Sequence, residues 1–283
     1  MPIFPETRSA LVLREKTFLS LRNLIYEASG LFFDQLNRQT FEQRLRLRVE
    51  ALRFDSFERY YLYLRYADHD GEELQRAIDA LAVHETYFFR EKRALQAFGQ
   101  EILPLLERSN SDLRALRIWS AGCSTGEEAY TLAMLVLESG LFVDWDVKII
   151  GSDISPRVIA KATLGRYPRT AFRAMERRLR ARYFKRQADG SWQVIPELRR
   201  MVTFNRVNLI AEGSDESLGD FDVIFCRNVL IYFDQRARQR AISTLHRALR
   251  DGGYLVLGAA ESLMASDTPF KLVRLQNDFV YQK

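Results

Sequence analysis

The feature that most constrains the fold begins at Leu113, where short β-branched or apolar runs start to alternate with helical ones. Five such runs can be recognised along the sequence: LRIWSA, VKIIGSD, MVTFNRVN, FDVIFCRN and GYLVLGAAES. This alternation is typical of a parallel sheet with crossover helices. We therefore predict an α/β domain over residues 94–283, closed by an antiparallel hairpin at 270–280.

The stretch from about 165 to 200 interrupts that alternation. It contains a basic helical run followed by the turn signal Asp189-Gly190, with apolar and aromatic residues on both sides. The basic residues of the run are Arg177, Arg178, Arg180 and Arg182. We predict an inserted antiparallel β-subdomain at this position.

The first third of the chain predicts a small helical domain over residues 1–83. Four amphipathic helices are expected, and Gly30 is placed to end the first of them. Their apolar stripes are Phe18, Leu21, Ile25 and Ala28; Phe41, Leu45, Val49 and Leu52; Phe57, Tyr61 and Leu64; and Leu74, Ile78 and Leu81. Residues 84–93 break the helical periodicity and are expected to link the two domains.

Composition narrows the classes of function. The two cysteines, Cys123 and Cys226, lie inside predicted elements, so we expect both thiols to be reduced. Three scattered histidines predict no metal site.

The net charge of +5 suggests an acidic partner surface. No long apolar run occurs and residues 1–10 lack signal-peptide order, so we expect a cytoplasmic protein without membrane insertion.

The first predicted strand of the α/β domain leads through small residues into a helix that begins near Gly126. The sequence there is Ile118-Trp119-Ser120-Ala121-Gly122-Cys123-Ser124-Thr125-Gly126-Glu127-Glu128. Small side chains allow close approach of a ligand, and a helix N-terminus offers unpaired N–H groups. A simple tight crossover is the alternative interpretation.

An acidic residue, Asp153, ends the second strand, where nucleoside-binding sheets bond ribose hydroxyls. Ser155 is the better cap for the following helix, which leaves Asp153 available. A dinucleotide is disfavoured, because the G-x-G-x-x-G spacing is absent and two glutamates would repel a pyrophosphate. Glu127 and Glu128 suit a ligand with an amine and a sulfonium, such as S-adenosylmethionine, although Glu127 is also explained as a favourable helix N-terminal charge.

Several motifs, in order along nearly the whole chain, resemble the CheR family of chemotaxis receptor methyltransferases. They are His84-Glu85-Thr86-Tyr87-Phe88-Phe89-Arg90-Glu91, Gly122-Cys123-Ser124-Thr125-Gly126-Glu127-Glu128-Ala129-Tyr130, Ser152-Asp153-Ile154, Asn208-Leu209 and Phe225-Cys226-Arg227-Asn228-Val229-Leu230-Ile231-Tyr232-Phe233. The resemblance implies a class I S-adenosylmethionine-dependent methyltransferase with a Rossmann-like doubly wound sheet, a small N-terminal all-α domain and an inserted antiparallel β-subdomain.

The resemblance also implies a set of site residues. Arg90 and Tyr232 are expected to be catalytic, with Arg90 near the substrate carboxylate and Tyr232 facing the methyl group. The residues expected to bind the cofactor, or its product S-adenosylhomocysteine, are His84, Thr86, Arg90, Ala121, Gly122, Glu128, Asp153, Asn208, Leu209, Arg227 and Asn228. One departure concerns His84, where many members of the family carry Asn.

The implied activity is methyl transfer to glutamate side chains of chemoreceptors. A glutamate with an ordinary pKa of about 4.3 is ionised at neutral pH and needs no general base. Arg90 is therefore expected to orient the carboxylate rather than activate it. The alternatives are a methyltransferase of a related non-flagellar chemosensory pathway and a non-catalytic scaffold that binds S-adenosylmethionine.

The expected partner is the acidic helical region of a receptor. Four arginines on the second predicted helix, Arg44, Arg46, Arg48 and Arg53, form the candidate docking surface, and a solvated helix face is the alternative. A receptor-tail peptide is a further candidate partner, at the β-subdomain. Nucleic acid is disfavoured, because Cys226-Arg227-Asn228 stands where base-methylating enzymes carry Asn/Asp-Pro-Pro-aromatic.

Overall fold

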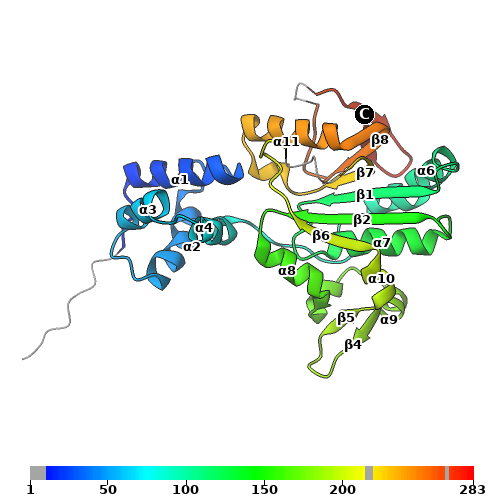
Figure 1. Ribbon diagram of the computed structural model, residues 1–283, viewed down its shortest axis with the longest axis horizontal. Helices are drawn as coiled ribbons and strands as arrows, with labels where there is room; N and C mark the ends of the chain where they lie inside the picture. Colours follow the sequence, from blue (N-terminus) through cyan, green and yellow to red (C-terminus); the bar gives the residue numbers. More distant parts are fainter. Residues whose placement is uncertain (1–10, 214–218, 265–267) are drawn as a thin grey trace, which may run out of the picture. The chain divides into compact units, whose positions relative to one another are not determined.

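The computed structural model describes residues 11–213, 219–264 and 268–283. Residues 1–10, which bear on the signal-peptide expectation, lie outside this description. The chain divides into two compact units, Met1–Val83 and His84–Lys283, both drawn in Figure 1. Each unit is considered by itself.

The N-terminal unit is helical, as the periodicity predicts. Over residues 11–83 the structure has four helices, α1 (Glu15–Ser29), α2 (Arg38–Ala51), α3 (Phe57–Tyr66) and α4 (Glu72–Leu81). Gly30 ends α1 in the left-handed region, with a φ of 76°, a conformation that glycine adopts without steric cost. The predicted stop of the first helix is therefore confirmed.

The core of this unit contains most of the predicted apolar stripes. Phe18, Phe41 and Phe57 are completely buried. Leu52 was expected on the stripe of α2 but is 39% exposed. That prediction is wrong because α2 ends at Ala51, so the helical angle that places Leu52 on the stripe no longer applies.

The second unit contains a seven-stranded sheet in the order β6-β2-β1-β7-β8-β10-β9. Its strands are β1 (Ala115–Ala121), β2 (Asp146–Asp153), β6 (Val202–Arg206), β7 (Phe221–Cys226), β8 (Leu249–Leu257), β9 (Lys271–Arg274) and β10 (Phe279–Gln282). The first five pair in parallel, and β10 pairs antiparallel with both β8 and β9. The five predicted strands and the closing hairpin are thus confirmed.

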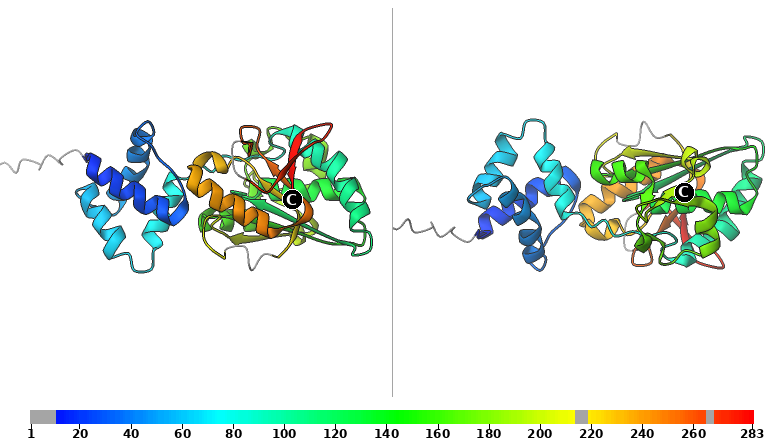
Figure 2. Two further views of the ribbon diagram at one scale, coloured as in Figure 1. Left: turned by 90° about the horizontal axis from the view of Figure 1, so that it is seen from above. Right: turned by 90° about the horizontal axis from the view of Figure 1, so that it is seen from below.

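Strand β1 pairs with β2 on one side and with β7 on the other. The chain therefore winds outward from β1 in two opposite directions. Because parallel crossovers are right-handed, the helices of the two halves cover opposite faces of the sheet. In Figure 2, α11 lies toward the viewer from above and α8 toward the viewer from below.

The helices of this unit include one segment with π-helical geometry, η1. The set is α5 (Lys92–Ala97), η1 (Phe98–Ile102), α6 (Leu103–Ser109), α7 (Glu127–Ser139), α8 (Pro156–Leu164), α10 (Pro196–Arg200), the short η3 (Leu230–Tyr232) and α11 (Gln235–Ala248). The buried side chains of α5, η1, α6 and α7 join Leu116 and Ile118 of β1 in one hydrophobic core. No helix in the described part of the chain is both long and apolar enough to cross a membrane.

The predicted β-subdomain is present. It comprises β3 (Arg166–Tyr167), η2 (Arg169–Phe172), α9 (Arg177–Tyr183), β4 (Phe184–Arg186) and β5 (Trp192–Val194). Its strands form an antiparallel sheet in the order β3-β5-β4. The phenyl ring of Phe88 is fully buried, with its centroid 5.0 Å from that of Phe172 and 4.9 Å from that of Phe184.

Candidate functional site

The candidate site lies at the carboxyl edge of the parallel strands. The strand register brings Ala121 opposite Ser152 and Asp153 opposite Arg206. Ligands of open α/β sheets bind outside the carboxyl ends of the strands, at the point where the winding reverses. Here that point lies between β1 and β7.

The loop after β1 is shaped for close approach of its backbone to a ligand. Gly122, Ser124 and Gly126 all have positive φ values. A Cβ atom on Gly122 would lie 2.3 Å from Cγ2 of Val229, so no larger residue fits without displacing the loop after β7. The amides of Gly122 and Cys123 both donate to the carbonyl oxygen of Ser152 at 2.8 Å.

The Asp153 carboxylate is largely buried at the tip of β2. The sequence predicts that Asp153 is left free, and this is wrong. Its two oxygens accept hydrogen bonds from the amides of Ser124 and Ser155, each at 3.0 Å. These bonds hold the loop after β1. The predicted cap is confirmed, since the Ser155 side chain accepts from the Val158 amide.

Glu128 lies in the first turn of α7 and faces the end of β1. It accepts a hydrogen bond from the Ser120 hydroxyl at 2.7 Å and one from Arg227 Nη1 at 3.0 Å. Burial raises the pKa of the Glu128 carboxyl above its ordinary value, although Arg227 and the Ser120 hydroxyl favour the ionised form. A cation beside this carboxylate would therefore be strongly favoured.

Arg227 follows β7, and its side chain is only 3% exposed. Its guanidinium joins three parts of the site, because it bonds Glu128, Glu91 Oε2 at 3.1 Å and the carbonyl oxygen of Arg90 at 2.7 Å. Among the described residues, Nε of Arg227 has no hydrogen-bond partner. Arg227 thus joins the carboxyl edge of the sheet to the segment that carries Arg90.

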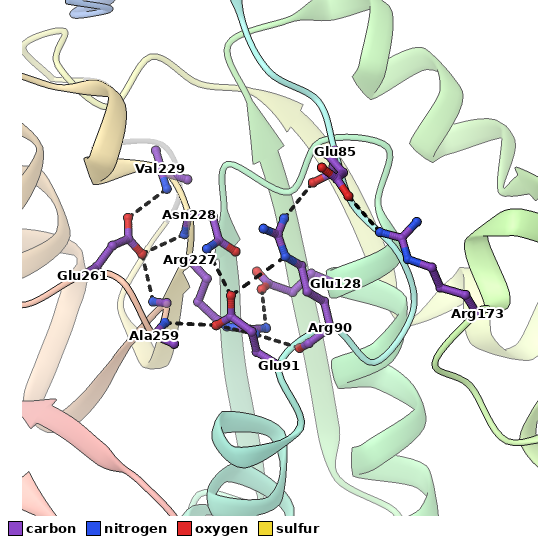
Figure 3. A network of polar contacts seen from close by, with 11 residues as sticks. Glu85, Arg90, Glu91, Glu128, Arg173, Arg227, Asn228, Val229, Ala259 and Glu261 are labelled. Atoms are coloured by element: carbon purple, nitrogen blue, oxygen red, sulfur yellow. Dashed lines mark hydrogen bonds and ion pairs between the residues drawn. The ribbon is translucent and has the colours of Figure 1, made fainter.

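Residues 84–91, here called the strap, cross the unit without helical structure. Arg90 Nη1 donates to the carbonyl oxygen of Glu85 at 2.7 Å, as Figure 3 shows. Nη2 of Arg90 donates to no other residue within the described part of the chain, and the side chain is 29% exposed. Arg90 therefore keeps donors available for a carboxylate.

The residues on both sides of Arg90 have left-handed backbone conformations. Phe89 has a φ of 60° and Glu91 a φ of 57°. Such conformations of non-glycine residues cost about 1–3 kcal/mol each and persist only where the surroundings hold them. The position of Arg90 is thus fixed by contacts on either side of it.

Glu91 supplies the contacts on one side. Besides Arg227, its carboxylate accepts from Asn228 Nδ2 and from the Ala259 amide, both at 3.0 Å. Burial alone raises the pKa of Glu91, but Arg227, the Ala259 amide and Asn228 together lower it below its ordinary value. Glu91 is therefore ionised and ties the strap to the ends of β7 and β8 (Figure 3).

The loop after β7 is organised by Glu261. Its carboxylate accepts from the amides of Asn228, Val229 and Leu230 at 2.7, 2.9 and 2.7 Å. It also accepts from the Gly258 amide at 2.8 Å. One side chain therefore fixes the backbone of the loop that bears Asn228 and leads to Tyr232.

The other residues expected at the site have the following positions. His84 begins the strap, and its carbonyl oxygen accepts from the Ser124 hydroxyl at 3.1 Å. Thr86 is half-buried in the strap. Asn208 and the buried Leu209 follow β6. Tyr232 ends η3 and is half-buried.

The structure adds Glu91, Glu261 and Ser120 to the residues singled out from the sequence. Glu91 stands next to Arg90 within a quoted motif, which was a usable signal. Ser120 likewise stands next to Ala121 within a quoted run and bonds Glu128, eight residues away. Glu261 carried no such signal, because its partners at 228–230 come from a distant segment of the chain.

The acceptor set fits S-adenosylmethionine. Glu128 can accept from its ammonium group and Asp153 from its ribose hydroxyls, while the loop at Gly122 leaves its backbone accessible. The buried Leu209 and Ile210 supply apolar surface near the ends of β2 and β6. The described residues contain no group of three or more side chains that could hold a metal ion.

The four arginines of the predicted docking helix have different surroundings. Arg48 donates to both oxygens of the buried Glu73, at 2.9 and 2.6 Å. Arg44 Nη1 donates to the carbonyl oxygen of Leu81 at 2.5 Å. Arg46 forms an ion pair with Glu42 at 2.6 Å, and Arg53 is exposed beyond the helix end. Arg44 and Arg48 thus stabilise the helical unit itself.

A doubly wound sheet with these acceptors at its carboxyl edge is the arrangement of a class I S-adenosylmethionine-dependent methyltransferase. Comparison with known proteins makes the assignment more specific. A family model described as CheR methyltransferase, SAM binding domain, matches residues 84–279, and one described as CheR methyltransferase, all-alpha domain, matches residues 16–82. The chain belongs to the CheR methyltransferase family.

Curated relatives match over most of the chain. Chemotaxis protein methyltransferase 2 of Vibrio cholerae is 36% identical over 274 residues, 96% of this chain and 94% of that protein. The chemotaxis protein methyltransferase of Borreliella burgdorferi is 34% identical, with 86% and 87% covered. The probable biofilm formation methyltransferase WspC of Pseudomonas aeruginosa is 33% identical, with 92% of this chain and 60% of that protein covered.

Proposed function

We propose that this protein transfers the methyl group of S-adenosylmethionine to glutamate side chains of chemotaxis receptors, in the cytoplasm. The products are a glutamate methyl ester and S-adenosylhomocysteine. Relatives named chemotaxis protein methyltransferases, at 34–36% identity over most of the chain, support this substrate class.

The availability of Arg90 carries the proposal. Its guanidinium is held at the strap by Glu85 and lies 3.9 Å from the Glu91 carboxylate, yet Nη2 stays available among the described residues. A planar guanidinium with open donors is suited to bind a carboxylate through two parallel bonds. The side chain therefore matches a carboxylate substrate better than an amine or a thiol.

The residues near Arg90 suit a reaction without proton abstraction. A glutamate carboxylate is already ionised at neutral pH, and S-adenosylmethionine, when bound, supplies the electrophilic methyl group. Glu91 is committed to Arg227, Asn228 and the Ala259 amide, so it is not placed to act as a base. Arg90 would orient the carboxylate, and Tyr232 would border the methyl group.

The test is methyl transfer from tritiated S-adenosylmethionine to receptor-containing membranes. A receptor band should acquire label, and mild base should release that label as methanol, because esters hydrolyse where N-methyl groups do not. Arg90→Ala should reduce the rate by about a hundredfold or more while the protein stays folded. Arg90→Lys should recover only part, because a point charge cannot form two parallel bonds.

Two outcomes would contradict the proposal. Base-stable label would exclude an ester product. Near-normal turnover by a folded Arg90→Ala variant would remove Arg90 from the reaction. An absence of label on every receptor tested, with intact cofactor binding, would instead favour a non-catalytic scaffold.

We also propose two docking surfaces for the receptor. The basic face of α2 suits an acidic helical region. Arg53 is its exposed charge, Arg46 would exchange its surface pairing with Glu42 for a receptor carboxylate, and Arg44 and Arg48 lie at the flanks. The β-subdomain sheet has two edge strands, β3 and β4, to which a receptor-tail peptide could add as a strand. The first surface is tested by charge reversal and the second by titration with tail peptides.

A second candidate function is methylation of a receptor in a non-flagellar chemosensory pathway. The similarity to the relative named probable biofilm formation methyltransferase favours it. The chemistry is the same, and only the labelled receptor differs. Labelling with membranes from strains that lack one receptor at a time would separate the two candidates.

A further inference from the structure

We propose that Arg173, a residue of the inserted β-subdomain, positions Arg90 for methyl transfer. The inference deepens the proposed function, because it names a second arginine on which the orientation of the first depends. Figure 3 shows the two guanidinium groups on either side of Glu85.

Arg173 contacts two residues of the strap, Glu85 and Tyr87. Its Nη2 atom lies 2.9 Å from Oε1 of Glu85. Its guanidinium carbon lies 3.6 Å from the centroid of the Tyr87 ring, a close cation–π contact. One side chain therefore holds two alternate residues of the strap.

Glu85 connects Arg173 to Arg90 by hydrogen bonds to both arginines. Its carboxylate accepts from Arg173, and its carbonyl oxygen accepts from Arg90 Nη1 at 2.7 Å. The guanidinium carbon of Arg90 also lies 6.0 Å from the centroid of the Tyr87 ring. If Arg173 were removed, Glu85 and Tyr87 would lose the contacts that fix the surface against which Arg90 rests.

The strained backbone next to Arg90 explains why the strap needs contacts such as those of Arg173. Phe89 and Glu91 both have positive φ values, so this segment would relax if it were released. Glu91 holds one end through Arg227. Phe88 holds the middle, where its amide donates to the carbonyl oxygen of Ala171 at 3.0 Å. Arg173 holds the segment before Phe88, through Glu85 and Tyr87.

This role predicts a loss of rate with little loss of stability. Arg173 is 48% exposed and Glu85 is 68% exposed, and exposed ion pairs contribute little to folding. A displacement of about 1 Å in a catalytic group can lower a rate by about a hundredfold. Because Phe88 and Glu91 remain, we expect Arg173→Ala to lower kcat by about tenfold.

The experiment compares kcat and KM for receptor methylation in Arg173→Ala, Arg173→Lys and Glu85→Gln. Arg173→Ala should lower kcat while KM for the receptor and the affinity for S-adenosylhomocysteine stay within about twofold. Glu85→Gln should lower kcat less than Arg173→Ala, because Arg173 keeps its contact with the Tyr87 ring and an acceptor oxygen at residue 85. Arg169→Ala, at an exposed arginine of the adjacent η2 helix, is the matched control and should behave as wild type.

A double-mutant cycle tests whether Arg173 acts through Arg90. In an Arg90→Ala background the Arg173→Ala change should have almost no further effect on the residual rate. An equal effect in both backgrounds would overturn the proposal, as would an unchanged kcat. A loss confined to KM for the receptor would show instead that Arg173 is a docking residue.

A substrate-free measurement separates this inference from the proposed function. The Nε–H signal of Arg90, assigned with Arg90→Lys, should shift or broaden in nitrogen-resolved NMR spectra of Arg173→Ala and stay in place in Arg169→Ala. An unmoved signal overturns the inference whatever the substrate. If the wild type methylates no receptor but the signal moves, the proposed function fails and the positioning of Arg90 stands.

Discussion

Glu128 is a buried carboxylate that needs a cation. Its neighbours Arg227 and Ser120 do not fully offset the cost of burial, and the pKa stays above its ordinary value. If Glu128 binds the ammonium group of the cofactor, binding requires the ionised form. The state of a single proton then controls the affinity.

We therefore predict that affinity for S-adenosylhomocysteine weakens as the pH falls through the raised pKa of Glu128. The fall should begin above the range in which ordinary glutamates titrate, about pH 4.3, and approach tenfold per pH unit. Calorimetry across pH 5–8 measures the effect. Glu128→Gln should bind more weakly at pH 8 and show a flatter profile, and an equally steep profile in that variant would exclude Glu128 as the titrating group.

Glu91 has the opposite shift, and the sign of its effect on stability follows. Its pKa in the folded protein is lowered, mainly because Arg227, the Ala259 amide and Asn228 outweigh the effect of burial. Its contribution is therefore present above the pKa of the unfolded chain and is lost as the pH falls through the lowered folded-state pKa.

Glu91→Gln should accordingly lower the free energy of unfolding by about 1–3 kcal/mol at pH 7. The difference from wild type should shrink toward zero in acid, where the wild-type carboxyl is protonated as well. Urea unfolding at a series of pH values tests this. Glu197→Gln, at an exposed residue of α10, is the control, and a pH-independent difference for Glu91→Gln would contradict the prediction.

At the scale of structural elements, the loop between β7 and η3 is held by one side chain. Glu261 binds the amides of Asn228, Val229 and Leu230 together with that of Gly258. Glutamine at this position would place two N–H donors among four others. Removing acceptors from buried donors leaves them unsatisfied.

We predict that Glu261→Gln destabilises the protein by about 1–3 kcal/mol and weakens S-adenosylhomocysteine binding, because Asn228 is held by this loop. Thermal unfolding and calorimetry give the two values. Glu212→Gln, in the segment after β6, should change neither. Full stability and full affinity in Glu261→Gln would show that the four hydrogen bonds contribute little.

At the scale of helices and strands, the sequence predicted correctly those elements that depend on a local pattern of residues. Alternation predicted the five parallel strands, and Asp189-Gly190 predicted the turn between β4 and β5. The prediction that Leu52 is buried failed, because a periodic pattern does not show where a helix ends. The pairing of Glu73 with Arg48 and Tyr60 could not be predicted, because it joins three helices that meet only in the folded unit.

The candidate site shows the same limit. The motifs located Arg90, Glu128 and Asp153 in the chain. They did not reveal that Asp153 holds the amides of Ser124 and Ser155, since a carboxylate beside a turn can face either a ligand or the backbone. Arg173 was missed because its partners lie far away in the sequence.

For the whole molecule, the prediction that matters concerns recognition of the receptor. Reversing Arg46 and Arg53 to Glu should raise the apparent KM for the receptor several-fold to about tenfold at low salt, because exposed charges mainly steer association. Cofactor binding should be unchanged. Added salt should weaken the wild type more than the variant, because exposed charges are screened over about 10 Å at 0.1 M.

The control is reversal of Arg59 and Arg65, two exposed arginines of α3 in the same unit, which changes the net charge equally. Arg46→Glu also creates two pairs of glutamates one helical turn apart, with Glu42 and with Glu50, at a cost of about 0.5 kcal/mol for each pair, so both variants are compared at matched stability. An equal KM for wild type and the α2 variant at low salt would identify this helix face as merely solvated.

The hydrogen bond between the Ser124 hydroxyl and the carbonyl oxygen of His84 has a mechanical consequence. His84 is the first residue of the second unit, so a displacement that travels along the backbone from the preceding residues reaches the strap at His84. The hydrogen bond to Ser124 anchors the strap to the loop after β1 at this residue. Because this bond precedes Arg90 in the chain, it opposes the spread of such a displacement along the strap toward Arg90.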